Sequence, residues 1–276
     1  MTHLSPAVQA YFSGSKPRVL AHRGLTFVGS RLNPSDNPDL LPSIDENSIQ
    51  AFITAQDAGA QLIESDLQVT KDGVAVLFHD NDLHRVAGVK KKIRDLNLAE
   101  LQRISLEHGA RIPTLREALI ALPKAKFNLD FKVRGVIAPA VRIIKELEAY
   151  DRVLVAGFSD LRRLAALKKL GRPMATSAGS ITVIRLWLMA KLGNQRAVER
   201  LAKGIHALQI PTHSGKISLC SPGFIAAMHG AGLELHYWTI NDPEQMLELL
   251  RLGADGLVTD RADLAAQVVD RFRRFG

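Results

Sequence analysis

The stretch Leu-Ile-Glu-Ser-Asp-Leu-Gln-Val at residues 62–69 has the pattern of a β-strand whose two faces differ. Successive side chains of a strand point to opposite faces, so Glu64, Asp66 and Gln68 share one face. The opposite face is apolar, and we expect it to pack against helices: it carries Ile63, Leu67 and Val69. The pattern predicts a strand of an α/β fold with its two carboxylates turned away from the helices.

Seven further apolar runs lie before and after this strand, and helical patterns fill the gaps. The runs are Arg18–His22, Lys126–Lys132, Arg152–Gly157, Arg172–Ser177, Ala207–Ile210, Glu234–Ile240 and Gly256–Thr259. Alternating strands and helices form parallel sheets, and eight units in 276 residues favour a closed (β/α)8 TIM barrel over an open sheet. The first strand is not followed by the G-x-G-x-x-G pattern of dinucleotide-binding folds. No break in composition divides the chain, so we expect residues 1–276 to form a single domain.

Two segments have the composition of insertions. Residues 25–45 follow the first strand and are rich in Pro, Asp and Asn, and residues 81–112 form a small, basic insertion after the second strand. The run Val74–His79 follows Asp72-Gly73 and predicts a strand that returns antiparallel to the second strand. We expect both insertions at the C-terminal face of the barrel, where barrel enzymes carry out their chemistry.

Capping residues mark several helix boundaries. Thr114 and Glu117 match a capping box at the start of one helix. Asp242-Pro243 supplies a cap and a first-turn proline for a helix that ends at Gly253. These signals support helices between the predicted strands.

Composition limits the kinds of partner. Hydrophobic residues make up 46% of the chain and charged residues 23%, which is ordinary for a globular protein. The net charge of +8 favours anionic partners such as phosphate esters, nucleic acid or an anionic membrane, or it belongs to a solvated surface. The densest basic cluster comprises only Lys90, Lys91, Lys92 and Arg94, so we expect no nucleic-acid partner.

Location is also constrained by the sequence. Cys220 is the one cysteine, so it cannot form an intramolecular disulfide, and we interpret it as structural. Residues 1–16 lack the charged start and apolar core of a signal peptide. No uncharged apolar stretch is long enough for a transmembrane segment, and we therefore expect a cytoplasmic protein.

The third predicted strand repeats the polar pattern of the second. Three of its polar side chains share one face: Asn128, Asp130 and Lys132. Asp130 would complete a three-carboxylate site with Glu64 and Asp66, and such hard oxygen ligands suit Mg²⁺ or Ca²⁺. Lys132 would then contact a phosphate oxygen. The alternatives are a solvent-facing carboxylate pair on the second strand and an internal ion pair between Asp130 and Lys132.

Two histidines are expected near the same carboxylates. The first strand ends in His22 and Arg23, and the predicted hairpin ends at His79. A histidine at the C-terminal end of a barrel strand can act as a general acid or base. Arg23 can hold a phosphate with two hydrogen bonds.

Three more residues are candidates for substrate contact. Glu46 and Asn47 open the helix after the first insertion, close to the same rim, although helix capping would explain Asn47 equally well. Trp238 lies on the seventh predicted strand and would pack against an apolar or sugar-like part of a substrate, or fill the core.

Taken in order, these residues resemble the glycerophosphodiester phosphodiesterase family from residue 18 to about residue 265. The matching pieces are His22-Arg23-Gly24, Glu46-Asn47-Ser48, Glu64-Ser65-Asp66, Lys71-Asp72-Gly73, Phe78-His79-Asp80 with Leu83 and Arg85, Asn128–Lys132, Trp238–Asn241 and Asp255–Asp260. Each piece alone is weak, but the ordered set with its spacings is specific.

The resemblance implies a (β/α)8 fold and hydrolysis of a phosphodiester to an alcohol and glycerol 3-phosphate. It implies His22 and His79 as the general acid–base pair and a divalent ion, Mg²⁺ or Ca²⁺. The implied metal ligands are Glu64, Asp66 and Asp130. The implied substrate contacts are Arg23 and Lys132 for phosphate, Glu46 at the site, and Trp238 for glycerol. The glycerol 2-hydroxyl would attack first, and water would then open a cyclic phosphate.

The sequence departs from the family pattern in three places. Asp130 stands where the family often has Glu, Ser48 stands where it usually has Thr, and the first insertion is longer than usual. The main alternative is a lysophospholipase D acting on lysophospholipids, suggested by the apolar segment Ile181–Leu192. That segment would make peripheral membrane contact, or it would be an ordinary helix of the outer ring. A barrel that only binds phosphate or metal, and a nucleic-acid-binding protein, are more remote alternatives.

Overall fold

A closed barrel of eight parallel strands forms the centre of the computed structural model, which describes residues 4–27 and 43–275. The strands are β1 (Arg18–His22), β2 (Leu62–Val69), β6 (Phe127–Phe131), β7 (Val153–Ala156), β8 (Ala175–Thr176), β9 (Ala207–Ile210), β12 (Glu234–Tyr237) and β13 (Gly256–Thr259). Their order is β8-β7-β6-β2-β1-β13-β12-β9. A parallel bridge between Ser177 and Ala207 joins the two ends of this order, which confirms the predicted TIM barrel.

Four strands, β1, β2, β9 and β13, have the predicted bounds. The other four are shorter than predicted. β8 covers two residues rather than six, since Pro173 has no N–H to donate to a neighbouring strand. β12 ends at Tyr237 and not at Ile240, and β6 and β7 each lose one residue at both ends.

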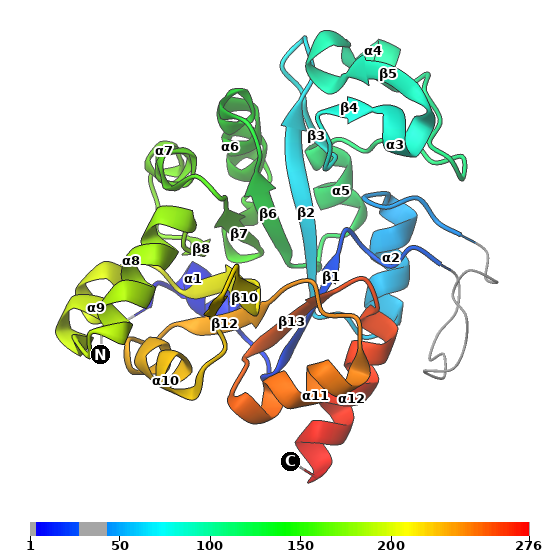
Figure 1. Cartoon of the computed structure of the whole chain (residues 1–276). Helices are drawn as coiled ribbons and strands as arrows, with labels where there is room; N and C mark the ends of the chain where they lie inside the picture. The colour runs from blue at the N-terminus through cyan, green and yellow to red at the C-terminus, as the bar shows by residue number, and fades with distance from the viewer. Residues whose placement is uncertain (1–3, 28–42, 276) are drawn as a thin grey trace.

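Helices surround the barrel, as Figure 1 shows. They are α2 (Ile49–Asp57), α5 (Leu115–Ala121), α6 (Ile137–Glu146), α7 (Asp160–Leu170), α8 (Ser180–Lys191), α9 (Gln195–Ala202), α10 (Pro222–Gly230), α11 (Pro243–Leu252) and α12 (Ala262–Phe275). Short 3-10 turns are η2 (Ile93–Asp95), η3 (Arg134–Val136) and η4 (Ala149–Asp151). The helices bury one apolar stripe each; in α6 this stripe includes Ile137, Val141 and Ile144. The predicted caps are confirmed: Thr114 and Glu117 form a capping box, and Asp242 caps α11.

The insertion after β2 packs as a small unit at the upper right of Figure 1. Its elements are β3 (Ala75–Leu77), β4 (Asp82–Leu83), α3 (His84–Ala87), β5 (Val89–Lys92) and α4 (Leu98–Leu101), and β3 pairs antiparallel with β2 as predicted. It has its own apolar core, which includes Phe78, Leu83 and Ile93. Most of the other predicted insertion, residues 28–42, lies outside the described residues.

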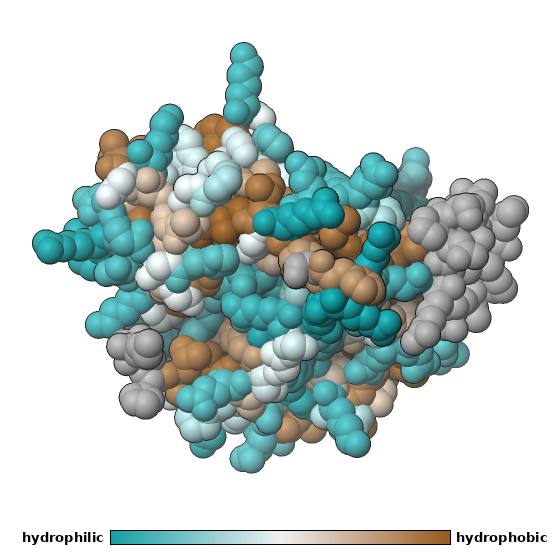
Figure 2. Space-filling model, turned by 90° about the horizontal axis from the view of Figure 1, so that it is seen from below, coloured by the Kyte–Doolittle hydropathy of each residue, from teal (hydrophilic) through white to brown (hydrophobic). Residues whose placement is uncertain are grey.

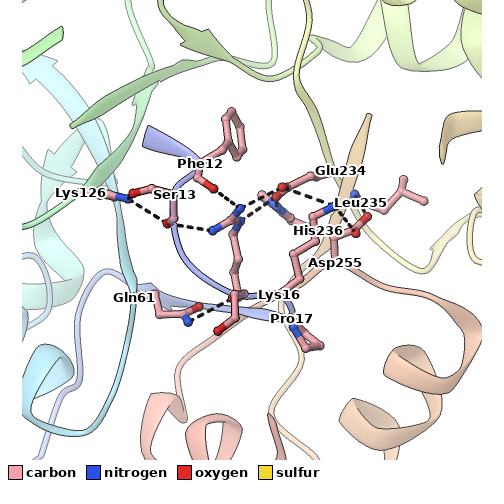
Figure 3. A network of polar contacts seen from close by, with 12 residues as sticks. Phe12, Ser13, Lys16, Pro17, Gln61, Lys126, Glu234, Leu235, His236 and Asp255 are labelled. Carbon is pink, nitrogen blue, oxygen red and sulfur yellow. Dashed lines mark hydrogen bonds and ion pairs between the residues drawn. The ribbon is translucent and has the colours of Figure 1, made fainter. Parts of the chain in front are cut away.

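The N-terminal end of the barrel is closed by α1 (Pro6–Tyr11). The Tyr11 ring is fully buried inside the barrel, against Leu20 and Leu62 among others. Below it, Arg18 donates to both carboxylate oxygens of Glu234, at 2.7 and 3.0 Å, and to the carbonyl oxygen of Phe12 at 2.7 Å. Figure 3 shows this polar network, whose hydrogen bonds join β1 to β12. The opposite, C-terminal end of the barrel is the end where barrel enzymes have their active sites.

Hydrophilic and hydrophobic side chains are mixed on the surface. Seen from below in Figure 2, hydrophilic side chains cover most of the molecule, and hydrophobic ones show in patches between them. Within residues 4–27 and 43–275, no helix is long and apolar enough to cross a membrane.

Candidate active site

A cavity of about 700 Å³ opens at the C-terminal ends of the barrel strands. Nine polar or aromatic residues predicted for the site or its strand faces line it: His22, Arg23, Glu64, Asp66, His79, Asn128, Asp130, Lys132 and Trp238. They come from the ends of β1, β2, β6 and β12 and from the β3 hairpin. Glu46 and Asn47 do not line the cavity.

The carboxylates converge because β2 and β6 are neighbours in register. Glu64 pairs with Asn128, and Asp66 pairs with Asp130, so the polar faces of both strands point the same way. Nζ of Lys132 lies 2.9 Å from Asp66 Oδ1 and 3.0 Å from Asp130 Oδ2. The predicted alternative of an ion pair between Asp130 and Lys132 is therefore present, with Asp66 as a third member.

The charges in this cluster are not balanced. Burial, and after it the charge of Asp66, raise the pKa of Glu64 to about 8. Burial and Asp66 also raise the pKa of Asp130. Burial lowers the pKa of Lys132, but Asp66 and Asp130 outweigh it and hold that pKa above its ordinary value. Lys132 pairs with Asp66 and Asp130, and Nε of Arg23 approaches Asp66 at 3.6 Å, so three carboxylates face two permanently basic side chains.

Free carboxylate oxygens in this cluster suit a hard cation. Oε2 of Glu64, Oδ2 of Asp66 and Oδ1 of Asp130 are buried and accept no hydrogen bond from any residue that the structure describes. Buried carboxylate oxygens without donors are costly, and a divalent cation bound by oxygen ligands would remove that cost. Among the described residues, however, no three acidic, histidine or cysteine side chains are already gathered as a metal cage. The donor chemistry fits Mg²⁺ or Ca²⁺, while Lys132 is the cation that the structure places there.

His22 is held in place by a carboxylate from the last strand. Its Nδ1 lies 2.7 Å from Oδ1 of Asp260, and its Nε2 lies 4.0 Å from Oε2 of Glu64. Asp260 in turn accepts a hydrogen bond from the Asn241 side chain at 2.8 Å. Burial lowers the pKa of His22, but Asp260 and Glu64 outweigh it and raise that pKa. Sequence reasoning assigned no role to Asp260, although it ends the matching piece Asp255–Asp260 and follows β13 directly.

His79 is held in a similar way by its neighbour. Its Nδ1 lies 2.6 Å from Oδ1 of Asp80, and Oδ2 of Asp80 accepts from Nε of Arg85 at 2.7 Å. Arg85 also donates to both oxygens of Glu46, at 2.9 and 2.6 Å. Glu46 contacts Nη1 of Arg23 at 3.2 Å. A chain of ion pairs thus links His79 in the hairpin to Arg23 after β1, and sequence reasoning assigned no role to Asp80 or Arg85.

The position of Arg23 depends on the glycine that follows it. Gly24 has φ +90°, and a Cβ there would lie 2.7 Å from the backbone of Ala51 in α2. This close approach fixes the turn between β1 and α2. Nε of Arg23 is buried and makes no hydrogen bond to any described residue, although Asp66 Oδ2 lies 3.6 Å away. Arg23 therefore has a donor available for an anion.

Asn47 lies behind the cavity wall. It is buried, and its side-chain oxygen accepts a hydrogen bond from Ser65 at 2.5 Å. Ser65 points away from the cavity on β2, between Glu64 and Asp66. The structure thus gives Asn47 a supporting position, and its contact with substrate stays a prediction.

The other half of the cavity is apolar. It is lined by side chains from the loop after β7, from α8 and from the hairpin β10 (His213–Ser214) and β11 (Ile217–Ser218): Phe158, Val183, Ile184, Trp187, Ile217 and Leu219. Trp238 packs edge-to-face on Phe158 with ring centroids 6.1 Å apart. The Lys132 ammonium lies 5.6 Å from the centre of the Phe158 ring, at the boundary between the two halves.

Comparison with known proteins identifies the family of this chain. The profile of the Glycerophosphoryl diester phosphodiesterase family matches residues 22–264. The chain is 37% identical over 252 residues to a probable glycerophosphodiester phosphodiesterase 2 of Mycobacterium tuberculosis, covering 91% of this chain and 90% of that protein. It is more distantly similar to a lysophospholipase D from Homo sapiens, at 24% identity over 78% of this chain and 79% of the relative.

Solved structures share the fold. A glycerophosphodiester phosphodiesterase from Parabacteroides distasonis superposes with a TM-score of 0.71 at 21% identity, covering 94% of this chain and 100% of the other. An Oleispira antarctica phosphodiesterase in complex with the product sn-glycerol-3-phosphate gives 0.69 at 24% identity, covering 92% and 97%. Since the family profile matches most of the chain, this protein is a phosphoric diester hydrolase and belongs to the glycerophosphoryl diester phosphodiesterase family.

Proposed function

We propose that this chain hydrolyses glycerophosphodiesters to an alcohol and glycerol 3-phosphate, with His22 and His79 as the general acid–base pair. One observation carries the proposal: both histidines line a single cavity, and an aspartate binds Nδ1 of each. This leaves Nε2 of each ring as the nitrogen that exchanges a proton with the substrate. The relatives named as glycerophosphodiester phosphodiesterases support the choice of substrate class.

In this mechanism, one histidine removes the proton of an attacking hydroxyl, and the bond between phosphorus and the leaving oxygen breaks. The other histidine gives a proton to that leaving oxygen, so an alcohol departs. If the glycerol 2-hydroxyl attacks first, the product is a cyclic phosphate, which water opens in a second step with the histidine roles reversed. Arg23 and Lys132 oppose the charge of the phosphodiester.

Glu64, Asp66 and Asp130 would hold Mg²⁺ or Ca²⁺, and their unpartnered oxygens support this assignment. When bound, the cation supplies positive charge that neutralises the phosphodiester. We further propose that Glu46 orients Arg23, that Asn47 supports β2, and that Trp238 contacts the glycerol moiety.

The test is glycerol 3-phosphate release from glycerophosphocholine, first with EDTA and then with added Mg²⁺ or Ca²⁺. We expect no release with EDTA and restored release with one of the two ions. Full release in EDTA would show that activity needs no divalent metal. No release with either ion would show that glycerophosphocholine is not a substrate.

A second candidate is lysophospholipase D activity, and the apolar half of the cavity favours it. Phe158, Ile184 and Trp187 offer a surface for an aliphatic chain, which the head group of glycerophosphocholine does not need. The similarity to a lysophospholipase D supports the same class. Turnover of lysophosphatidylcholine above that of glycerophosphocholine would select this candidate, and equal or lower turnover would reject it.

A nucleic-acid substrate has only the net charge in its favour, and we do not propose one. The cytoplasmic location and the single-domain organisation inferred from the sequence stay predictions. The segment at residues 181–192 remains our candidate for contact with a lipid surface.

A further inference from the structure

Large apolar side chains are exposed on α7, on α8 and in the loop before α7, beside the cavity that Phe158 and Ile184 line. We call this surface the apolar rim, and it comprises Phe158, Leu161, Leu164, Ile181, Ile184 and Leu188. Leu161 is 81% exposed, and Ile184 is 63% exposed. Single exposed apolar residues are ordinary on protein surfaces, whereas a group of them beside a cavity marks an interaction site.

The rim is built from two helices that are fixed to each other. Asp160 at the start of α7 accepts hydrogen bonds from the backbone N–H of Gly179 at 3.1 Å and of Thr182 at 3.0 Å. The N–H of Ser180 donates to the carbonyl oxygen of Phe158 at 2.9 Å. These bonds hold the first turns of α7 and α8 side by side, so the exposed Leu161 and Ile181 lie in adjacent first turns.

Helix α8 is apolar on two sides, whereas an outer helix of a barrel normally has one apolar stripe that faces the core. Leu186 is completely buried and packs in the core. Ile181, Ile184 and Leu188 have the three- and four-residue spacing of a second stripe, and all three are exposed. The core therefore accounts for one stripe of α8 and leaves the other without a partner among the described residues.

The rim is continuous with the cavity. Phe158 and Ile184 line the cavity and are also 58% and 63% exposed. A chain-like molecule leaving the cavity on its apolar side would therefore pass between side chains of the rim. An object that covers the rim would also cover the entrance to the site.

The charge around the rim selects the kind of partner. Residues 158–196 contain eight Lys or Arg and a single acidic residue, Asp160. Arg163 is buried and pairs with Asp160 at 3.0 Å, which leaves seven basic residues in this segment without an acidic neighbour in the segment itself. Arg185 and Lys191 are exposed on α8 itself. A second copy of this chain would bring the same basic surface against itself in a two-fold dimer, which opposes that partner. Apolar side chains flanked by basic ones match an anionic phospholipid surface.

We propose that the apolar rim docks on an anionic phospholipid bilayer and places the cavity mouth against that surface. Leu161, Leu164 and Ile181 enter the boundary between head groups and acyl chains, and Arg185 and Lys191 contact lipid phosphates. The claim that docking brings the active site to its substrate rests on the proposed function. The claim that the rim binds a bilayer does not depend on that function.

The experiment is co-sedimentation of the full chain with phosphatidylcholine vesicles that either contain or lack phosphatidylglycerol. The test variant combines Leu161→Asp and Ile181→Asp, which lie in first helical turns where aspartate is tolerated, and neither residue lines the cavity. The matched control is Ile120→Asp, because Ile120 is 58% exposed on α5, outside the rim. Arg185→Glu tests the charge separately. Thermal unfolding shows whether each variant is folded.

We expect the unmodified chain to sediment with phosphatidylglycerol vesicles and to bind them at least about tenfold more strongly than the double variant does. Ile120→Asp should bind like the unmodified chain. Arg185→Glu should lower binding to vesicles that contain phosphatidylglycerol and should not change binding to vesicles that lack it. No binding of the unmodified chain, or equal loss in Ile120→Asp and the double variant, would overturn the proposal. Because sedimentation needs no turnover, a failure to hydrolyse glycerophosphocholine would refute the proposed function without changing this result.

Discussion

Asp260 and His22 are 238 positions apart in the chain, yet their side chains meet at 2.7 Å between Oδ1 and Nδ1. They meet because β1 and β13 are parallel neighbours, with Ala21 beside Thr259. His22 and Asp260 each follow that aligned pair by one residue. The barrel therefore supplies His22 with a carboxylate that fixes its ring orientation.

We predict that Asp260→Asn lowers kcat by roughly 10²-fold and leaves KM nearly unchanged, because an amide cannot hold the imidazolium that forms during proton transfer. The measurement is steady-state release of glycerol 3-phosphate from glycerophosphocholine. Asp270→Asn is the control, since Asp270 is an exposed carboxylate on α12. Parallel losses in kcat and thermal stability would instead assign Asp260 a purely structural role.

His22→Ala and His79→Ala should each reduce kcat by about 10²- to 10⁴-fold without unfolding the protein, since each removes one of the two groups that move protons. Both rings are partly exposed at the cavity, so little core packing is lost. Turnover and thermal unfolding are measured on the same samples. Full activity in either variant would exclude that histidine from the acid–base pair.

Added Mg²⁺ or Ca²⁺ should raise the melting temperature of the EDTA-treated chain, because a ligand that binds only the folded state stabilises it by mass action. Asp66→Asn should abolish the rise, since Asp66 is buried between Glu64 and Asp130 in the cluster. Asp72→Asn is the control, because Asp72 lies in the β2–β3 hairpin turn and faces Thr70. An identical rise in both variants would mean that the cation binds elsewhere.

Acid should weaken the barrel through Glu234, whose pKa lies at about 2 against 4.5 for an unpaired glutamate. Burial opposes this shift, but His236 and Arg18 outweigh it. A lowered folded-state pKa gives stability that is complete above the unfolded value of 4.5 and is lost as pH falls towards about 2.

Glu234→Gln should therefore lower the free energy of unfolding by about 3 kcal/mol near neutral pH and by much less near the folded-state pKa. Urea unfolding at several pH values provides the measurement, and Glu244→Gln on α11 serves as the control. A pH-independent difference between Glu234→Gln and the unmodified chain would show that the ion pair with Arg18 does not cause the stability change.

The sequence by itself determined the features that depend on neighbours along the chain. Alternation in residues 62–69 placed Glu64 and Asp66 on one face, because the side-chain period of a strand is two whatever the fold. Thr114 with Glu117 and Asp242 marked helix starts for the same reason, since a cap bonds to a backbone only two or three residues away. The strand patterns and the family resemblance together singled out nine residues that line the cavity.

Only the tertiary structure decided which distant residues meet. The contact of Asp260 with His22, and that of Arg18 with Glu234, depend on closure of the barrel, which makes early and late strands neighbours. No local period encodes such a pairing, because it depends on strand register across the whole sheet. The apolar rim is similar: leucines of α7 and isoleucines of α8 are ordinary in sequence, and Leu161 and Ile181 lie in adjacent first turns only because Asp160 bonds the start of one helix to the other.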